Sequence, residues 1–233
     1  MATFDERARE WDTPDKIERA AEVAAVIGAA VPMSGTERAI EVGAGTGLLG
    51  LQFAGKLREL VLTDPSTGML EVAGQKVRRE GLRNVRTRRF DLTADAMPER
   101  FDLLISLLML HHVEDTAAAL GAMHTLLAPG GRIAVADLDT EDGTFHTAEA
   151  EGIHHQGFDR GDLGRVAEAA GFVDVAFRTA ATIEEEGRRY PLFLLTARAS
   201  AGAGATGAAG ASGAAGASGA AGTTGATEDS ATG

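Results

Sequence analysis

Two glycine patterns overlap in the segment AIEVGAGTGLLGLQFA, which covers residues 39–54. Read from Gly45, the letters GTGLLG match GxGxxG, in which glycines permit a tight turn and the close approach of a pyrophosphate to a helix start. Read from Glu41, the same segment is ExGxGxG. Gly43, Gly45 and Gly47 therefore predict a loop that binds a nucleotide-containing cofactor, without deciding which one.

An acidic residue after the next apolar run is placed to bind a ribose. Asp64 ends the segment LVLTD, and a carboxylate at the end of the second strand can accept hydrogen bonds from ribose hydroxyls. NAD and S-adenosylmethionine both contain this ribose. The glycines and Asp64 therefore leave both cofactors open.

Three further features favour S-adenosylmethionine. Glu41 lies two residues before the first glycine, where a carboxylate hinders a pyrophosphate but can act through water on the amino group of a methionine. Hydride-transferring short-chain enzymes need Tyr-x-x-x-Lys, whereas the only tyrosine, Tyr190, is followed by Pro-Leu-Phe-Leu. Asp91 lies at the end of the third predicted strand, where a carboxylate can accept a hydrogen bond from the exocyclic amine of adenine.

The candidate catalytic residues are histidines that follow a fourth apolar run, FDLLISL. Histidine suits general base catalysis near neutral pH, so we predict His111 or His112 as a base or a substrate contact. The alternative for each is a packed or capping histidine.

Three other histidines lie in or near an unusually long connection, residues 142–163, of a length typical of lids. His146, His154 and His155 are expected either in a substrate pocket or in an ordinary loop. Together with Asp137 and Asp139 they supply ligand types that suit divalent metal ions. No compact ligand spacing supports such a site, and we predict no metal.

The elements that must position these residues alternate between apolar runs and helical patterns. A helix is predicted over residues 15–31, after Pro14 and the capping candidate Thr13. Strands are predicted at 39–42, 59–63, 85–90, 101–107, 131–138, 172–178 and 191–198, with helices from about Gly47 and over 66–80, 115–127 and 161–171. This alternation predicts a doubly wound α/β domain with a mostly parallel sheet, whose ligand lies at the carboxyl ends of the strands.

Composition narrows the class of partner. The formal net charge of −12 disfavours nucleic acid unless a basic patch overrides it. The densest basic segment, residues 76–89, is typical of a solvated helix end and turn. The chain has no cysteine, which excludes thiol nucleophiles, and its charged start and short apolar runs predict a cytoplasmic protein without membrane contact. The oligomeric state cannot be predicted from the sequence.

The last part of the chain differs from the rest in composition. From residue 199 it is almost entirely Ala, Gly, Ser and Thr, which predicts a disordered tail over 199–233 after a domain of residues 1–198. Glycine recurs every third position from Gly207 to Gly225, but without proline the segment lacks the stiffness of a collagen strand.

The order of these motifs resembles the class I S-adenosylmethionine-dependent methyltransferases, especially the small-molecule branch that includes ubiquinone/menaquinone C-methyltransferase-like enzymes. The resemblance covers residues 4–198 and is carried by EVGAGTG, LTDPSTGML, FDLTADAMP, FDLLISLLMLHHVED, LLAPGGRIAVADL and AAGF. It implies a Rossmann-like seven-stranded sheet whose last strand, residues 190–198, is antiparallel.

The resemblance also implies which residues contact the cofactor. The family's N-terminal helix covers the cofactor, so Phe4 and Trp11 are expected near the pocket, with the indole face attracting the cationic sulfonium. The matching positions fall into four groups: Glu41, Gly43, Gly45 and Gly47 at the methionine part; Asp64, Pro65 and Met69 at the ribose and adenine; Asp91 and Leu92 at the adenine edge; and Ser106 to Met109 beneath the sulfonium.

The implied reaction is in-line methyl transfer to a small organic acceptor. Ser106-Leu107-Leu108-Met109 replaces the Asn/Asp-Pro-Pro-Tyr segment of many amino-group methyltransferases, and the lack of cysteine excludes cytosine C5 and thiol-dependent arsenic methylation. O- or C-methylation is therefore predicted. The other hypotheses are a non-catalytic S-adenosylmethionine-binding regulatory module and an NAD-dependent oxidoreductase.

Overall fold

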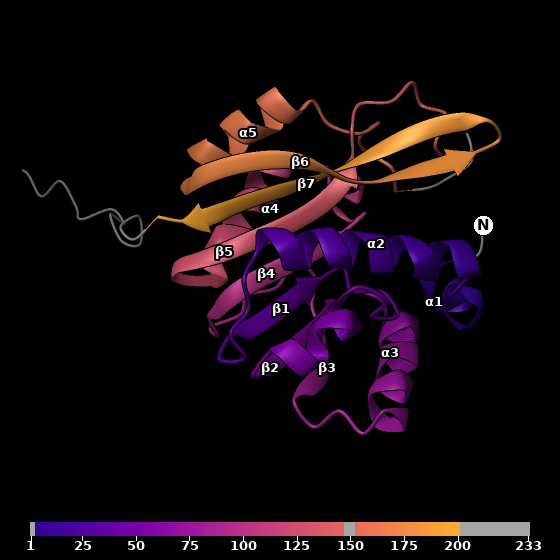
Figure 1. Ribbon diagram of the computed structural model, residues 1–233, viewed down its shortest axis with the longest axis vertical. Helices are drawn as coiled ribbons and strands as arrows, with labels where there is room; N and C mark the ends of the chain where they lie inside the picture. Colours follow the sequence, from indigo (N-terminus) through magenta and orange to yellow (C-terminus); the bar gives the residue numbers. More distant parts are fainter. Residues whose placement is uncertain (1–2, 147–151, 201–233) are drawn as a thin grey trace, which may run out of the picture. The chain divides into compact units, whose positions relative to one another are not determined.

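The fold is built on one sheet in a computed structural model that describes residues 3–146 and 152–200. The strands are β1 (Arg38–Val42), β2 (Glu59–Asp64), β3 (Val85–Arg89), β4 (Phe101–Leu107), β5 (Leu127–Leu138), β6 (Phe172–Glu185) and β7 (Arg188–Ala199). They form a seven-stranded sheet in the order β3-β2-β1-β4-β5-β7-β6 (Figure 1). β1 to β5 are parallel and β7 is antiparallel to both neighbours, which confirms the predicted fold class.

Helices cover both faces of this sheet. They are α1 (Phe4–Arg7), α2 (Pro14–Ala30), α3 (Thr67–Arg79), α4 (Thr116–Thr125) and α5 (Arg160–Ala169), with the 3₁₀ helices η1 (Ala8–Glu10), η2 (Gly50–Lys56) and η3 (Leu110–His112). α2, η2 and α3 share a core with one set of alternating strand residues, whereas α4 and α5 share a second core with the other set. In β1, Ala39 therefore packs on the first face and Ile40 on the second.

Side-chain caps begin α3, α4 and α5, as Thr3 does for α1. The Ser66 hydroxyl accepts a hydrogen bond from the Met69 amide at the start of α3. Asp115 and Asp159 cap α4 and α5 in the same way. These caps satisfy amides that have no partner inside the helix, so they fix where each helix starts relative to the strand before it.

The helix predicted from about Gly47 starts later than expected. Gly43, Gly45 and Gly47 all have positive φ angles, of 68°, 52° and 82°, and such residues interrupt helical geometry. The chain therefore turns until Leu49, and the 3₁₀ helix η2 begins at Gly50.

The last two strands are longer than their apolar runs predicted. β6 and β7 form a hairpin that turns at Glu186 and Gly187, whose φ angles are 49° and 76°. Two positive φ angles at the turn suit the twist of an antiparallel pair. Near the tip, Glu184 pairs with Arg189 across the two strands, so charged residues replace the apolar signal there.

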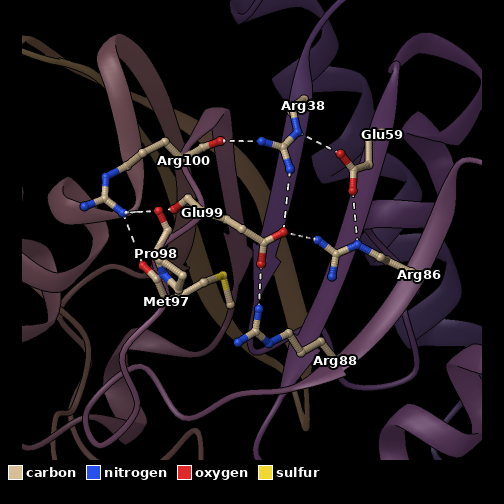
Figure 2. A network of polar contacts seen from close by, with 8 residues as sticks. All are labelled: Arg38, Glu59, Arg86, Arg88, Met97, Pro98, Glu99 and Arg100. Carbon is tan, nitrogen blue, oxygen red and sulfur yellow. Dashed lines mark hydrogen bonds and ion pairs between the residues drawn. The ribbon is translucent and has the colours of Figure 1, made fainter.

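The basic segment at residues 76–89 contributes to a network of ion pairs. Arg38, Glu59, Arg86, Arg88 and Glu99 form this charge network, which begins at the amino ends of β1 and β2 (Figure 2). Arg86 lies 3.0 Å from Glu59 and 2.6 Å from Glu99, and Arg88 lies 2.6 Å from the other Glu99 oxygen. The acids of the protein itself thus pair with these two arginines.

Two expectations concern the limits of the folded part. β7 ends at Ala199, one residue after the predicted domain boundary, and the predicted tail lies outside the described residues from position 201. Within residues 3–146 and 152–200, no helix combines the length and the apolar character needed to cross a membrane.

Candidate active site

Two adjoining cavities lie at the carboxyl ends of β1, β2 and β4. Their volumes are about 240 and 630 Å³, and four residues line both: Gly43, Pro65, Met109 and His112. The smaller cavity alone is below the roughly 300–1,000 Å³ typical of small-molecule sites. We therefore treat the first cavity, on the side of the glycine loop, and the second, on the side of β3, as one elongated site.

The glycine loop opens the first cavity. A Cβ atom on Gly45 would lie 3.9 Å from both the Met69 sulfur and the Trp11 indole nitrogen, two groups that line this cavity. Bare backbone at Gly45 thus leaves room for a ligand. Gly47 does not line the cavity; its amide donates to the Ala44 carbonyl, so its role is in the turn.

Asp64 presents a largely buried carboxylate to the first cavity. Its oxygens accept hydrogen bonds from the Gly45 amide at 2.8 Å and the Ser66 amide at 2.9 Å. Each oxygen keeps a second lone pair, which suits a ribose hydroxyl. Burial raises the pKa of Asp64, and the two backbone hydrogen bonds oppose that shift.

Glu41 is the second acid of the first cavity. It is 1% exposed, and its Oε2 accepts a hydrogen bond from the Gly50 amide at 3.0 Å. A Cβ on residue 50 would overlap this oxygen, so glycine is needed there. Burial raises the pKa of Glu41 to about 8. A cationic ligand group beside the carboxyl would oppose this shift and favour the ionised form.

Asp91 and Leu92 line the second cavity beside Pro65. Asp91 Oδ1 accepts hydrogen bonds from the Thr93 hydroxyl at 2.7 Å and the Thr93 amide at 2.9 Å. The hydroxyl bond is the main reason that the pKa of Asp91 is lowered, so the carboxylate is anionic. An anionic acceptor and an apolar wall suit the amine and the ring of an adenine.

Ser106 lies within the sheet instead of in the cavity wall. Its buried hydroxyl donates to the Val42 carbonyl at 2.8 Å, which ties β4 to β1, and it lines neither cavity. The wall is formed by Leu107, Leu108 and Met109. Leu108 has a φ of 51°, a strained conformation for leucine of the kind that gathers at functional sites.

The two adjacent histidines have different surroundings. His111 is 1% exposed, lines neither cavity and places Nδ1 2.6 Å from Asp137. His112 lines both cavities, with Nδ1 2.8 Å from the Gly152 carbonyl. Because a carbonyl only accepts, Nδ1 of His112 carries the hydrogen and Nε2 of the neutral ring is available as a base. Burial, followed by the charge of His111, lowers the pKa of His112 and favours this neutral form.

The histidines of the long connection do not gather around a common point. His146 packs behind the pair, with its ring centroid 5.0 Å from that of His111, and burial lowers its pKa to about 4. His154 lines the second cavity, whereas His155 Nε2 lies 2.9 Å from the Val113 carbonyl.

The five candidate metal ligands are likewise dispersed. Asp139 forms an ion pair with Arg160, and Asp137 is bonded to His111. Across the described ranges, 3–146 and 152–200, no group of three or more His, Cys, Asp or Glu side chains could hold a metal ion.

Phe4 and Trp11 both line the first cavity, and two cations lie over the indole ring. Lys16 Nζ lies 3.9 Å from the centroid of the Trp11 ring, and the Arg7 guanidinium carbon lies at 5.5 Å. A sulfonium would compete with these cations for the ring, so the expected attraction of the sulfonium to its face stays a prediction. Phe4 contacts His112 edge to face, with ring centroids 5.7 Å apart.

Polar contacts hold the N-terminal segment over the cavity. Asp5 Oδ1 accepts hydrogen bonds from the Ser66 hydroxyl at 2.6 Å and the Gly68 amide at 2.7 Å, both at the start of α3. Asp12 accepts from the Thr46 hydroxyl and pairs with Lys76, each at 2.5 Å. These two acids attach the segment to both the glycine loop and α3.

Sequence reasoning named two residues that shape the site but missed the contacts that they make. Met109 packs so closely on Gly43 that a Cβ there would overlap its side chain, a contact between distant segments that no local pattern indicates. Asp137 was considered only as a metal ligand. Its position at the carboxyl end of a buried strand, like that of Asp64, was the available signal.

Residues 40–133 match a family model described as a methyltransferase domain. An uncharacterized methyltransferase of Mycobacterium bovis is 32% identical over 112 residues, covering 48% of this chain and 55% of that protein. A ubiquinone biosynthesis O-methyltransferase of Azotobacter vinelandii is 33% identical over 98 residues, covering 42% of each chain. The chain thus spans about half the length of the curated relatives it matches.

Solved structures show the same fold. Phosphoethanolamine N-methyltransferase 2 of Haemonchus contortus, in complex with S-adenosyl-L-methionine, superposes with a TM-score of 0.66 at 16% identity, covering 86% of this chain and 60% of that one. At this identity the likeness concerns the architecture alone, with the same layers of helices around one mostly parallel sheet.

Proposed function

We propose that the chain is a class I S-adenosylmethionine-dependent methyltransferase, which transfers a methyl group from this cofactor to a small organic acceptor by O- or C-methylation. One observation carries the proposal: the cavity lined by Glu41 and Asp64 also contains His112, whose Nε2 has no hydrogen-bond partner among the residues that the structure describes. Cofactor-binding acids and a candidate base thus line one continuous site.

The residues of the cavities fit the parts of the cofactor. We assign the ribose to Asp64, the methionine amino group to Glu41 and the adenine to Asp91 and Leu92, with Pro65 and Met69 as apolar contacts. The bare backbone at Gly45 leaves space beside these groups. The match to a methyltransferase domain supports S-adenosylmethionine over NAD.

The proposed chemistry needs few protein groups. S-adenosylmethionine supplies a methyl group that is already activated on a sulfonium sulfur. The protein holds the acceptor in line, and such positioning is worth up to roughly 7–11 kcal/mol in favourable systems. For a hydroxyl acceptor, His112 Nε2 accepts the proton that the hydroxyl loses, a contribution of about 10² to 10⁴ in rate.

The domain and its acceptor are also part of the proposal. We assign the activity to residues 1–198 and give the Ala/Gly/Ser/Thr-rich tail no part in it. A small acceptor is favoured over nucleic acid because Arg86 and Arg88 of the basic segment are paired with acids. The name of the Azotobacter relative supports oxygen as the methylated atom.

The test is methyl transfer to a panel of phenols, quinones and carboxylic acids, with S-adenosylmethionine labelled in its methyl group. We expect label in at least one acceptor, and formation of S-adenosylhomocysteine in equal amount. Tight cofactor binding without transfer to any acceptor would instead favour a non-catalytic binding module.

A further inference from the structure

Asp137, at the carboxyl end of β5, is a fully buried carboxylate that lines neither cavity. Burial of a carboxylate costs free energy unless hydrogen bonds replace its hydration. Replacing such a group with apolar residues is often neutral or stabilising, so stability alone is a weak reason for its presence. Its hydrogen-bond partners indicate what it does.

Four donors surround this carboxylate. Oδ2 accepts from the Leu110 amide at 2.8 Å and the His111 amide at 3.3 Å. Oδ1 bonds His111 Nδ1 at 2.6 Å and accepts from the Leu138 amide at 2.8 Å. Met109 makes no side-chain cap at the start of η3. Asp137 therefore supplies the cap from a neighbouring strand and fixes the His111 ring at the same time.

The 3₁₀ helix held in this way ends at His112. Three contacts place the His112 ring: the His111 ring at a centroid distance of 4.2 Å, the Gly152 carbonyl at 2.8 Å and the Phe4 ring at 5.7 Å. The first depends directly on Asp137, because the His111 ring is bonded to its carboxylate. A displaced His111 would leave one side of the His112 ring without support.

We propose that Asp137 is a positioning residue: through η3 and the His111 ring, it holds the His112 imidazole with Nδ1 on the Gly152 carbonyl and Nε2 free for the acceptor. The catalytic consequence rests on the proposed function. The orientation and the tautomer of the His112 ring do not depend on the proposed function, because both exist in the protein without turnover.

The main test is the substitution Asp137→Asn, read by ¹⁵N NMR of the histidine rings, with the His112 signals assigned by loss in His112→Gln. Asparagine keeps the size but turns one acceptor oxygen into a donor, so it cannot accept all four hydrogen bonds. We expect the signals of His112 to change from the Nδ1–H tautomer to a mixture of tautomers. We expect kcat to fall about 10- to 100-fold, as for other groups that orient a functional histidine, while S-adenosylhomocysteine affinity stays close to that of the wild type.

A second variant and a matched control make the test decisive. His111→Asn keeps a donor for Asp137 but removes the ring beside His112, and we expect the same mixture of tautomers. If Asp137→Asn does not fold, His111→Asn tests the role of Asp137 in its place. Asp139→Asn is the control, because Asp139 lies two residues away and its carboxylate pairs with Arg160 of α5; its His112 signals should match the wild type.

A folded Asp137→Asn protein that keeps the Nδ1–H tautomer of His112 would overturn the inference, as would the same result in His111→Asn if the first variant does not fold. If the wild type binds S-adenosylmethionine but methylates nothing, the proposed function fails instead. The comparison of tautomers still decides the role of Asp137 in that case.

Discussion

Charged side chains have different surroundings at the two ends of β1 and β2. At the amino ends, Arg38 of β1 lies 2.7 Å from Glu59 of β2, within the charge network that also contains Arg86, Arg88 and Glu99 (Figure 2). At the carboxyl ends of the same strands, Glu41 and Asp64 are buried and form no ion pair within the described part of the chain. At the amino ends the charged side chains pair with one another, whereas at the carboxyl ends the acids remain available for a ligand.

The pKa values of the two glutamates express this contrast. The Arg38 hydrogen bond lowers the pKa of Glu59, whereas burial raises that of Glu41 to about 8. Glu59 therefore contributes stability that is present above its unfolded pKa and lost as pH falls through its lowered folded pKa. Glu41 has the opposite sign: the folded state holds a proton that the unfolded state releases, so stability falls as pH rises from about 4.5 to 8.

Among substitutions at the carboxyl ends of the strands, the largest expected effect is on turnover. For a hydroxyl acceptor, His112→Ala should lower kcat by about 10² to 10⁴, because it removes the ring nitrogen assigned as the base. Initial rates at saturating cofactor measure this loss. S-adenosylhomocysteine affinity, as the control, should be nearly unchanged. Full activity of the variant would leave base catalysis at this position without support.

The next effect is on cofactor affinity. Asp64→Ala should weaken S-adenosylhomocysteine binding by about 1.5–3 kcal/mol, since hydrogen bonds to a charged group are lost. Calorimetry on the folded variant measures the change. Asp139→Ala is a suitable comparison, because it removes a carboxylate of the same kind that lines neither cavity. Wild-type affinity in Asp64→Ala would remove the ribose assignment.

A third experiment uses the raised pKa of Glu41. If the carboxylate binds the methionine ammonium, S-adenosylmethionine affinity should rise with pH up to about 8, because the residue must lose its proton to bind. The slope is at most about tenfold per pH unit for one proton. Glu41→Gln should remove this slope. Titrations across the range in both proteins test the assignment, and equal slopes would contradict it.

The smallest expected effect is that of a substitution in the charge network at the amino ends of the strands. Glu99→Gln breaks the ion pairs with Arg86 and Arg88 and should cost about 1 kcal/mol of unfolding free energy, because partly exposed pairs contribute little. Thermal unfolding should shift by roughly 2–4 °C, with cofactor affinity unchanged. Glu168→Gln, which alters an exposed glutamate on α5, is the control. A loss of cofactor affinity in Glu99→Gln would show that the two ends are coupled.

Local patterns in the sequence predicted the framework because the central strands β1, β2 and β4 consist mostly of buried apolar residues. Asp64 is an example: its strand, the turn after it and the Ser66 cap are all encoded within a few neighbouring residues. The antiparallel direction of β7 was implied by the resemblance to a family and not by local patterns. Neither source predicted the hairpin tip, where exposed charges replace apolar alternation.

The rest of the site depends on contacts between distant segments. Nothing near Ser106 in the sequence indicates that its hydroxyl bonds the Val42 carbonyl, 64 residues earlier in the chain. The distinction between His111 and His112 likewise depends on Asp137, which is 26 residues further along the chain. Adjacent residues of one type can be separated only once their surroundings are known.

The most direct test of the account is calorimetric titration of the wild-type protein with S-adenosylhomocysteine and, separately, with NAD. We predict saturable binding of S-adenosylhomocysteine at one site per chain, weakened in Asp64→Ala, and no binding of NAD. Binding of NAD alone, or of neither compound to folded protein, would contradict the assignment of the cavity.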